Sequence, residues 1–319
     1  MRITASYSIV GLSIAAALAV SCQGGKSKSG RTDTYSSGAI SFASDESFSP
    51  FLEEELDIFH SIYTQAKVKP VYTNESDGIN RLLNTKTYLM IAARDFKPEE
   101  VENLKARRFQ PTSIKLAYDG LAVIANRQNP DTCISVKDLA RILTGEAVYW
   151  KDIVDGSAGG EITLVFDNGK SSAVHFAEDS ILGGKPITGK NVVAAKKTAD
   201  VIKYVEKTPG AIGIIGSNWL NDRRDSTNLT FNRNIRTMSV SRLDKATPEN
   251  SWKPYQYYIY NGNYPLVRTI YALLNDPLNA LPWGFAHFIA SPKGQLIILK
   301  TGLLPVQGNI TIRDVNVNG

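Results

Sequence analysis

Short apolar runs alternate with amphipathic helical patterns over most of the chain, and this alternation constrains the fold more than any other feature. Apolar runs at 39–43, 68–72 and 88–92 are each followed by a helical pattern. Strands and helices that alternate at this spacing are typical of a mostly parallel sheet covered on both faces. The sequence therefore predicts an α/β fold.

A second set of strands and helices follows between residues 126 and 262. Ser135 and Asp138 form a capping-box pattern at the start of one helix, and Gly145 is suited to its end. The other expected elements here are strands at 162–166, 191–194 and 211–215, and helices from about 171 and at 198–207. This set predicts a second α/β lobe inserted into the first.

The last part of the chain is predicted to return to the first lobe. We expect strands near 256–260 and 264–271, then helices at 282–290 and 292–300. Ser291 is suited to cap the last helix and Gly302 to stop it. Lobe 1 is thus expected to comprise residues 38–125 and 263–319, and lobe 2 residues 126–262.

The N-terminus carries an export signal. Arg2 precedes an apolar run at 9–20, which is too short for a bilayer core of about 30 Å but fits a signal peptide at residues 1–21. Residues 18–22 resemble a bacterial lipobox, which implies that Cys22 is lipidated. An ordinary cleaved signal peptide is the alternative. Residues 22–37, rich in Gly, Ser and Lys, are predicted to form a flexible tether.

Several partners and chemistries are disfavoured by the sequence. The net charge of +5 comes partly from short scattered basic pairs, without the basic stripe that nucleic-acid binding needs. His60, His175 and His287 lack the spacing of a metal site, so neither metal nor cofactor is expected. No G-x-S-x-G elbow is present, so no catalytic residue is predicted and the chain is not expected to be an enzyme. With Cys22 lipidated, Cys133 has no disulfide partner.

Five segments, at 40–48, 139–150, 208–213, 264–271 and 291–306, match in order the signatures of one family. The chain resembles the phosphate-binding proteins of bacterial phosphate ABC transporters, which have the type II periplasmic binding-protein fold. This resemblance implies two Rossmann-like lobes joined by two crossing strands, with the ligand in the cleft between them. It also implies a monomer, a membrane ABC permease as partner, and a place in the cell envelope. Gln23 favours the periplasmic face of the outer membrane.

Five candidate ligand contacts follow from this resemblance, and all lie where helices begin after strands. An oxyanion without a large cation beside it needs N–H and hydroxyl donors from several sides. Each serine taken alone could be a plain helix N-cap, which is the alternative. The candidates are Ser47, Phe48, Ser76, Ser171 and Ser172.

Two charged positions depart from the family pattern. Arg94 stands where the family usually has an aspartate, and Asp167 stands near the place of its arginine. Arg94 could still bind an oxyanion and Asp167 could accept from a protonated one, or the two could pair across the cleft. We therefore expect phosphate or a similar small oxyanion to be bound for uptake. The alternative is a binding or sensing module with a different ligand and no transport role.

Overall fold

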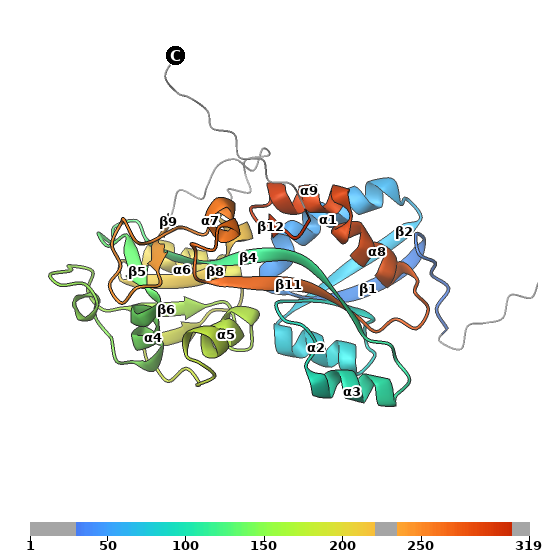
Figure 1. Ribbon diagram of the computed structural model, residues 1–319, viewed down its shortest axis with the longest axis horizontal. Helices are drawn as coiled ribbons and strands as arrows, with labels where there is room; N and C mark the ends of the chain where they lie inside the picture. The colour runs from blue at the N-terminus through green and yellow to red at the C-terminus, as the bar shows by residue number, and fades with distance from the viewer. Residues whose placement is uncertain (1–29, 221–234, 308–319) are drawn as a thin grey trace, which may run out of the picture. The chain divides into compact units, whose positions relative to one another are not determined.

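Strands β4 (Thr112–Asn126) and β11 (Val267–Leu274) run antiparallel through the middle of the sheet and connect its two halves (Figure 1). The computed structural model describes residues 30–220 and 235–307, and the part from Thr34 onward is one compact unit. The strand order is β2-β1-β3-β11-β4-β8-β6-β7. Polar groups at the ends of strands from either half therefore meet close to β4 and β11.

The first half of the sheet consists of parallel strands β1 (Gly38–Asp45), β2 (Ala66–Thr73) and β3 (Leu89–Ala92). Phe42 on β1 packs in a core with Phe59 and Phe285. A smaller cluster with Leu82 and Met90 covers the other face. The helices of this half are α1 (Ser49–Ile62), α2 (Glu75–Leu83), α3 (Pro98–Ala106), α8 (Leu281–Ala290) and α9 (Pro292–Lys300).

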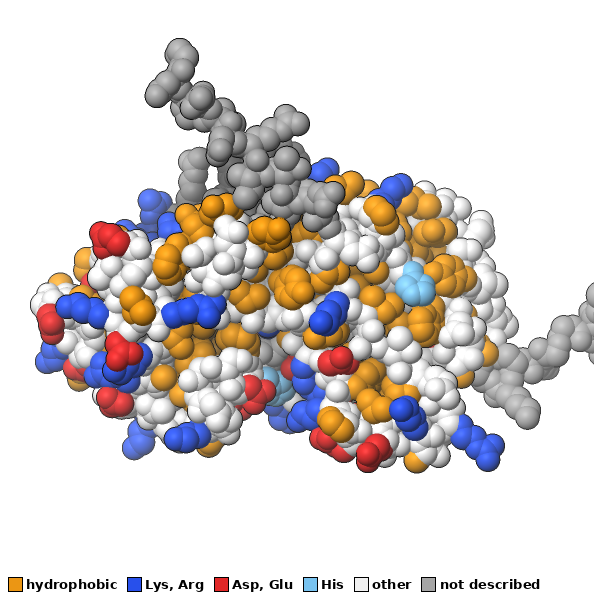
Figure 2. Space-filling view, viewed as in Figure 1, with side chains coloured by type: hydrophobic (Ala, Val, Ile, Leu, Met, Phe, Trp, Pro, Cys, Tyr) orange, Lys and Arg blue, Asp and Glu red, His pale blue; other side chains and the backbone are white. Residues whose placement is uncertain are grey.

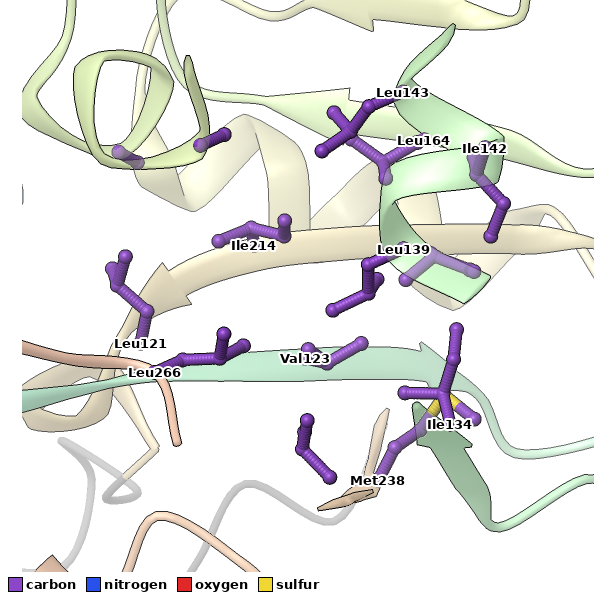
Figure 3. Packing of buried hydrophobic residues seen from close by; sticks show 14 of the residues in the cluster. Leu121, Val123, Ile134, Leu139, Ile142, Leu143, Leu164, Ile214, Met238 and Leu266 are labelled. Carbon is purple, nitrogen blue, oxygen red and sulfur yellow. The ribbon is translucent and has the colours of Figure 1, made fainter. Parts of the chain in front are cut away.

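The second half is built on β8 (Ala211–Gly216), β6 (Thr163–Phe166) and β7 (Val192–Ala194). Leu139 and Ile142 face a core with Val123 and Ile214 (Figure 3). A two-stranded sheet and a short strand paired with β4 complete this half. The remaining elements are α4 (Val136–Thr144), α5 (Ser172–Phe176), α6 (Thr198–Lys207), β5 (Cys133–Ser135), β9 (Ile235–Thr237) and β10 (Ser239–Ser241).

The predicted α/β class and the two central connecting strands are confirmed, and so is the capping box of Ser135 with Asp138. The strand predicted near 256–260 is wrong, because this segment is helix α7 (Gln256–Tyr260). Its aromatic residues favour strands, yet only Ile259 is buried, so the segment has no alternating apolar face. The side chain of Ile259 lies against Gly120, where an added Cβ would come within 2.9 Å of the Ile259 Cδ1.

Three local details shape this half. Strand β4 continues unbroken through Asp119 and Gly120. Ser49 is the first residue of α1, and Asp45 caps the short 3-10 turn at Glu46–Phe48 just before it. Asn74, rather than Ser76, caps α2, accepting from the N–H of Asp77 at 2.9 Å. The Ser76 hydroxyl is therefore left for another contact.

The predicted signal peptide at 1–21 and Cys22 lie outside the described residues. Within the predicted tether, Tyr35 reaches His287 of α8 at 2.8 Å. Among the residues described, no helix combines the length and the apolar character needed to cross a bilayer. The predicted lobe boundaries at 125/126 and 262/263 stay a prediction.

Candidate functional site

The carboxylate of Asp45, at the end of β1, joins the two halves of the fold. Its Oδ1 accepts from the N–H of Ser47 at 2.9 Å and from the Ser47 hydroxyl at 2.6 Å. Its Oδ2 accepts from the N–H of Ser172, at the start of α5, at 3.0 Å. The side chain is fully buried. Three donors from two distant segments thus converge on one carboxylate.

Arg268 of β11 supplies the positive charge at this point. Its Nε donates to Asp119 Oδ2 of β4 at 2.9 Å. Its Nη1 donates to the Ser172 hydroxyl at 2.6 Å and its Nη2 to the Ser47 hydroxyl at 3.2 Å. The guanidinium also lies over the ring of Phe48, 4.8 Å from its centroid. The cation therefore holds both serines and is itself held by a buried carboxylate.

A 3-10 turn after β8, Ser217–Trp219, fixes the other side of this network. The Ser217 N–H and hydroxyl donate to Asp119 Oδ1 at 2.8 and 2.9 Å. The Asn218 amide and the Trp219 indole both donate to the carbonyl of Ser47, at 3.1 and 2.9 Å. Side chains of the second half thereby set the backbone of the Ser47 turn in the first.

Glu75, Ser76 and His175 form a second contact between the halves. Glu75 Oε2 lies 2.8 Å from His175 Nδ1, and the Ser76 hydroxyl lies 3.2 Å from His175 Nε2. Glu75 Oε1 also accepts from the N–H of Ala93 at 2.7 Å. The face shown in Figure 2 has a histidine beside acidic and basic side chains between α2 and α5. This row of bonds links α2 to α5.

The row has the order of a serine-hydrolase triad. The hydrogen bond that His175 makes to Glu75 raises the pKa of His175, and burial opposes this effect. A raised pKa extends the pH range in which both ring nitrogens carry a proton and His175 cannot accept the proton of Ser76. The row links the two halves through Glu75, His175 and Ser76.

Arg94 pairs within its own half of the fold. Its guanidinium makes two bonds to the Glu100 carboxylate, at 2.6 and 2.8 Å, and one to the carbonyl of Asp95 at 2.9 Å. The charge of Glu75 also acts on it. In this structure Arg94 bonds to Glu100 rather than forming the bridge to Asp167 considered above.

Asp167 is buried at the end of β6, near the first cluster. Burial raises the pKa of its carboxyl to about 7, the charge of Asp45 adds to this, and Ser171 and Arg268 oppose it. Asp167 therefore keeps its proton to a higher pH than an ordinary aspartate, and the site becomes less negative as the pH falls. Ser171 caps α5 by accepting from the N–H of Val174, as the N-cap alternative predicts.

Carboxylates outnumber cations in this region. Arg268 is the most deeply buried cation, and Arg94 and His175 are partly exposed. Among residues 30–220 and 235–307, no group of three or more His, Cys, Asp or Glu side chains could hold a metal ion. The buried carboxylates of this region include Asp45, Glu75, Asp119 and Asp167.

The structure brings together Ser47, Phe48 and Ser172 around Arg268. Ser171 and Asp167 lie beside this group, and Ser76 lies in the second contact. The candidate set from the sequence did not include Arg268, Asp119 or Asp45. One available signal was charge inside an apolar strand, since Asp119 and Arg268 both interrupt runs that otherwise suit a buried sheet.

The comparisons with known proteins concern the family and the fold. The model of the PBP superfamily domain matches residues 29–293. The chain belongs to the PBP superfamily. The resemblance found in the sequence is confirmed at this level, and the fold with it.

Individual relatives are more distant. The chain is 24% identical over 275 residues to the phosphate-binding protein PstS of Borreliella burgdorferi, covering 84% of this chain and 90% of that protein. It is 23% identical over 282 residues to PstS of Staphylococcus aureus, covering 86% and 80%. A solved structure of a phosphate ABC transporter substrate-binding protein from Clostridium perfringens, with bound phosphate, superposes with a TM-score of 0.69 at 19% identity. It covers 85% of this chain and all of that one.

Proposed function

We propose that this superfamily member is an extracytoplasmic solute-binding protein that holds phosphate or a similar small oxyanion between two lobes and delivers it to a membrane ABC permease. The function is binding and not catalysis. Lobe 1 is residues 38–125 and 263–319, and lobe 2 is residues 126–262. The proposed ligand contacts are Ser47, Phe48, Ser76, Arg94, Asp167, Ser171 and Ser172, to which we add Arg268.

One observation carries this proposal: N–H and hydroxyl donors from both halves converge on the single carboxylate of Asp45, and one buried guanidinium donates to the hydroxyls beside it. Carboxylate and phosphate oxygens accept the same charge-assisted bonds. The donors are the N–H and hydroxyl of Ser47 and the N–H of Ser172. Arg268 donates to the hydroxyls of both serines. Relatives named for phosphate binding support the choice of ligand.

A specific observation favours the alternative of a different ligand. Asp45, Asp119 and Asp167 lie around Arg268, so the region is richer in negative charge than an anion site requires. A sensing module that binds a less charged solute fits this balance. Calorimetric titration with small organic monoanions and neutral solutes would identify such a ligand.

Calorimetric titration with phosphate tests the proposed site. We expect wild-type protein to bind with a dissociation constant below about 1 mM, and Ser47→Ala to bind at least about tenfold more weakly, because a hydrogen bond to a charged group is lost. Ser61→Ala is the control, since Ser61 is exposed on α1, outside the proposed site, and its hydroxyl donates to the carbonyl of Ile58. No heat with phosphate at millimolar concentration would refute the proposal.

The same titration with Arg94→Ala decides the role of Arg94. A loss of affinity comparable to that of Ser47→Ala would identify a ligand contact. Unchanged affinity would instead leave Arg94 as the partner of Glu100, which its two short bonds describe.

We also propose that the protein is anchored by a lipid on Cys22, because a short apolar run and a lipobox-like sequence precede it. Cys22→Ser should move the protein from the membrane to the soluble fraction after export. Cys133→Ser is the matched control and should leave the distribution unchanged. Equal release of wild-type and Cys22→Ser protein would favour an ordinary cleaved signal peptide.

A further inference from the structure

We propose that Asp45 is an internal competitor for the oxyanion site: its carboxylate takes the hydrogen bonds that ligand oxygens would take, and it holds the two halves of the fold together while no anion is bound. This inference rests on the proposed function, because it assigns the same donors to the ligand. It adds that the ligand must displace one of the protein's own side chains.

Asp45 accepts hydrogen bonds from both halves of the fold, as an anion bound between them would. Oδ1 takes both donors of Ser47, and Oδ2 takes the N–H of Ser172, 127 residues away in sequence. All three distances lie between 2.6 and 3.0 Å, the range of charge-assisted bonds. A phosphate oxygen cannot accept from the Ser172 N–H while Oδ2 does so.

Arg268 does not neutralise Asp45 by pairing with it directly. Its hydrogen bonds go to Asp119 and to the hydroxyls of Ser47 and Ser172. The guanidinium donates to the Ser47 hydroxyl, which in turn donates to the Asp45 carboxylate. Arg268 and Asp45 therefore both bond to serine groups that would contact a ligand. An incoming anion would face the charge of Asp45 at close range inside a buried site, where water screens little.

Two further acids of the first half contact the second half in the same manner. Glu46 Oε2 accepts from the N–H and the hydroxyl of Thr198, at 3.1 and 2.7 Å. Glu75 pairs with His175. Asp45 and Glu46, at and just after the end of β1, thus bond to donors at the helix starts Ser172 and Thr198, whereas Glu75 at the start of α2 bonds to His175 in the last turn of α5. Closure of the two halves therefore has its own anionic contacts and does not require a ligand.

Inorganic phosphate titrated by calorimetry into Asp45→Asn tests this role. We expect the variant to bind phosphate at least tenfold more tightly than wild type, because the amide removes the competing charge. Asp57→Asn, an exposed acid on α1, changes the net charge equally outside the site and should bind as wild type does. Because Asp45 also caps the turn at Glu46–Phe48, Asp45→Ser is a second variant that keeps an acceptor there without the charge.

The outcomes separate this inference from the proposed function. Equal or weaker phosphate binding by both Asp45 variants, with wild-type binding intact, would overturn the competitor role alone and make Asp45 a partner of the ligand. No phosphate binding by any variant would overturn the proposed function and the competitor role together. Small-angle scattering without phosphate adds an independent readout. We expect Asp45→Asn to be more expanded than wild type, and an unchanged profile would contradict the closing role.

Discussion

Replacing Arg268 with Ala is expected to lower the free energy of unfolding by about 3–5 kcal/mol and to abolish anion binding. Arg268 and Asp119 form a buried ion pair at 2.8 Å, with both side chains almost completely removed from solvent. Removing the guanidinium leaves the Asp119 carboxylate buried, with the two donors of Ser217 as its partners among the described residues. The substitution also removes the hydrogen bonds that the guanidinium donates to the Ser47 and Ser172 hydroxyls. Urea unfolding measures the first effect, and calorimetric titration with phosphate the second.

Arg141→Ala is the matched control for the loss of a paired arginine. Arg141 also bonds to two carboxylates, Glu146 and Asp138, but its side chain is partly exposed. Ion pairs in contact with water contribute about 1 kcal/mol or less, so this variant should unfold almost as wild type does. Equal stability of Arg268→Ala and Arg141→Ala would contradict the account of a buried pair.

A double variant separates the charge effect from the binding effect. Asp119→Asn combined with Arg268→Ala leaves no unpaired carboxylate in the sheet, so it should recover at least about 1 kcal/mol of the stability lost in Arg268→Ala. Phosphate binding should stay lost, because Arg268 is still missing. Recovery of binding in the double variant would mean that Arg268 serves only to neutralise Asp119.

The pairing of Asp119 with Arg268 shows what the sequence could and could not predict. The periodicity of the apolar residues predicts the strands and helices because each element buries one side, which is a local property. The register that sets Arg268 opposite Asp119 joins strands about 150 residues apart, and no local pattern encodes it. In the sequence alone, Asp119 followed by Gly120 looks like a turn that ends a strand. In the folded protein the charge is balanced across the strands.

The serine candidates show the same limit in another form. A serine before a helix fits both a cap and a ligand contact, and composition alone does not separate them. In the structure Ser171 is a cap, whereas Ser76 is not, because Asn74 takes that place. In the sequence, Asp45 is only an acid close to the candidates Ser47 and Phe48. Its role depends on Ser172 of the other half, and this contact exists only after both halves have folded.

Glu55 on α1 is expected to make the stability of the protein depend strongly on pH. Its side chain is fully buried, and within the described chain neither carboxylate oxygen has a hydrogen-bond partner. Burial raises the pKa of this carboxyl to about 9, from an ordinary value of 4.5. The folded protein therefore keeps the proton over a pH range in which the unfolded chain has already released it.

The direction of the effect follows from proton linkage. Below pH 4.5 Glu55 is protonated in both states, so its charge costs nothing. Above this pH the unfolded state gains by ionising, and the free energy of unfolding falls until the pH reaches about 9. At about 1.36 kcal/mol per pH unit, the total loss is at most about 6 kcal/mol.

Glu55→Gln removes the titrating group while keeping its shape, and urea unfolding at pH 5, 7 and 9 measures the result. We expect the free energy of unfolding of this variant to match that of wild type within about 1 kcal/mol at pH 5 and to exceed it by several kcal/mol at pH 9. The difference arises because only wild type has a carboxyl that ionises in the unfolded state and stays protonated in the folded one. Glu54→Gln is the control on the same helix, since Glu54 is exposed, and it should follow wild type at every pH. Parallel curves for wild type and Glu55→Gln would show that water or a rearranged side chain solvates the Glu55 carboxylate.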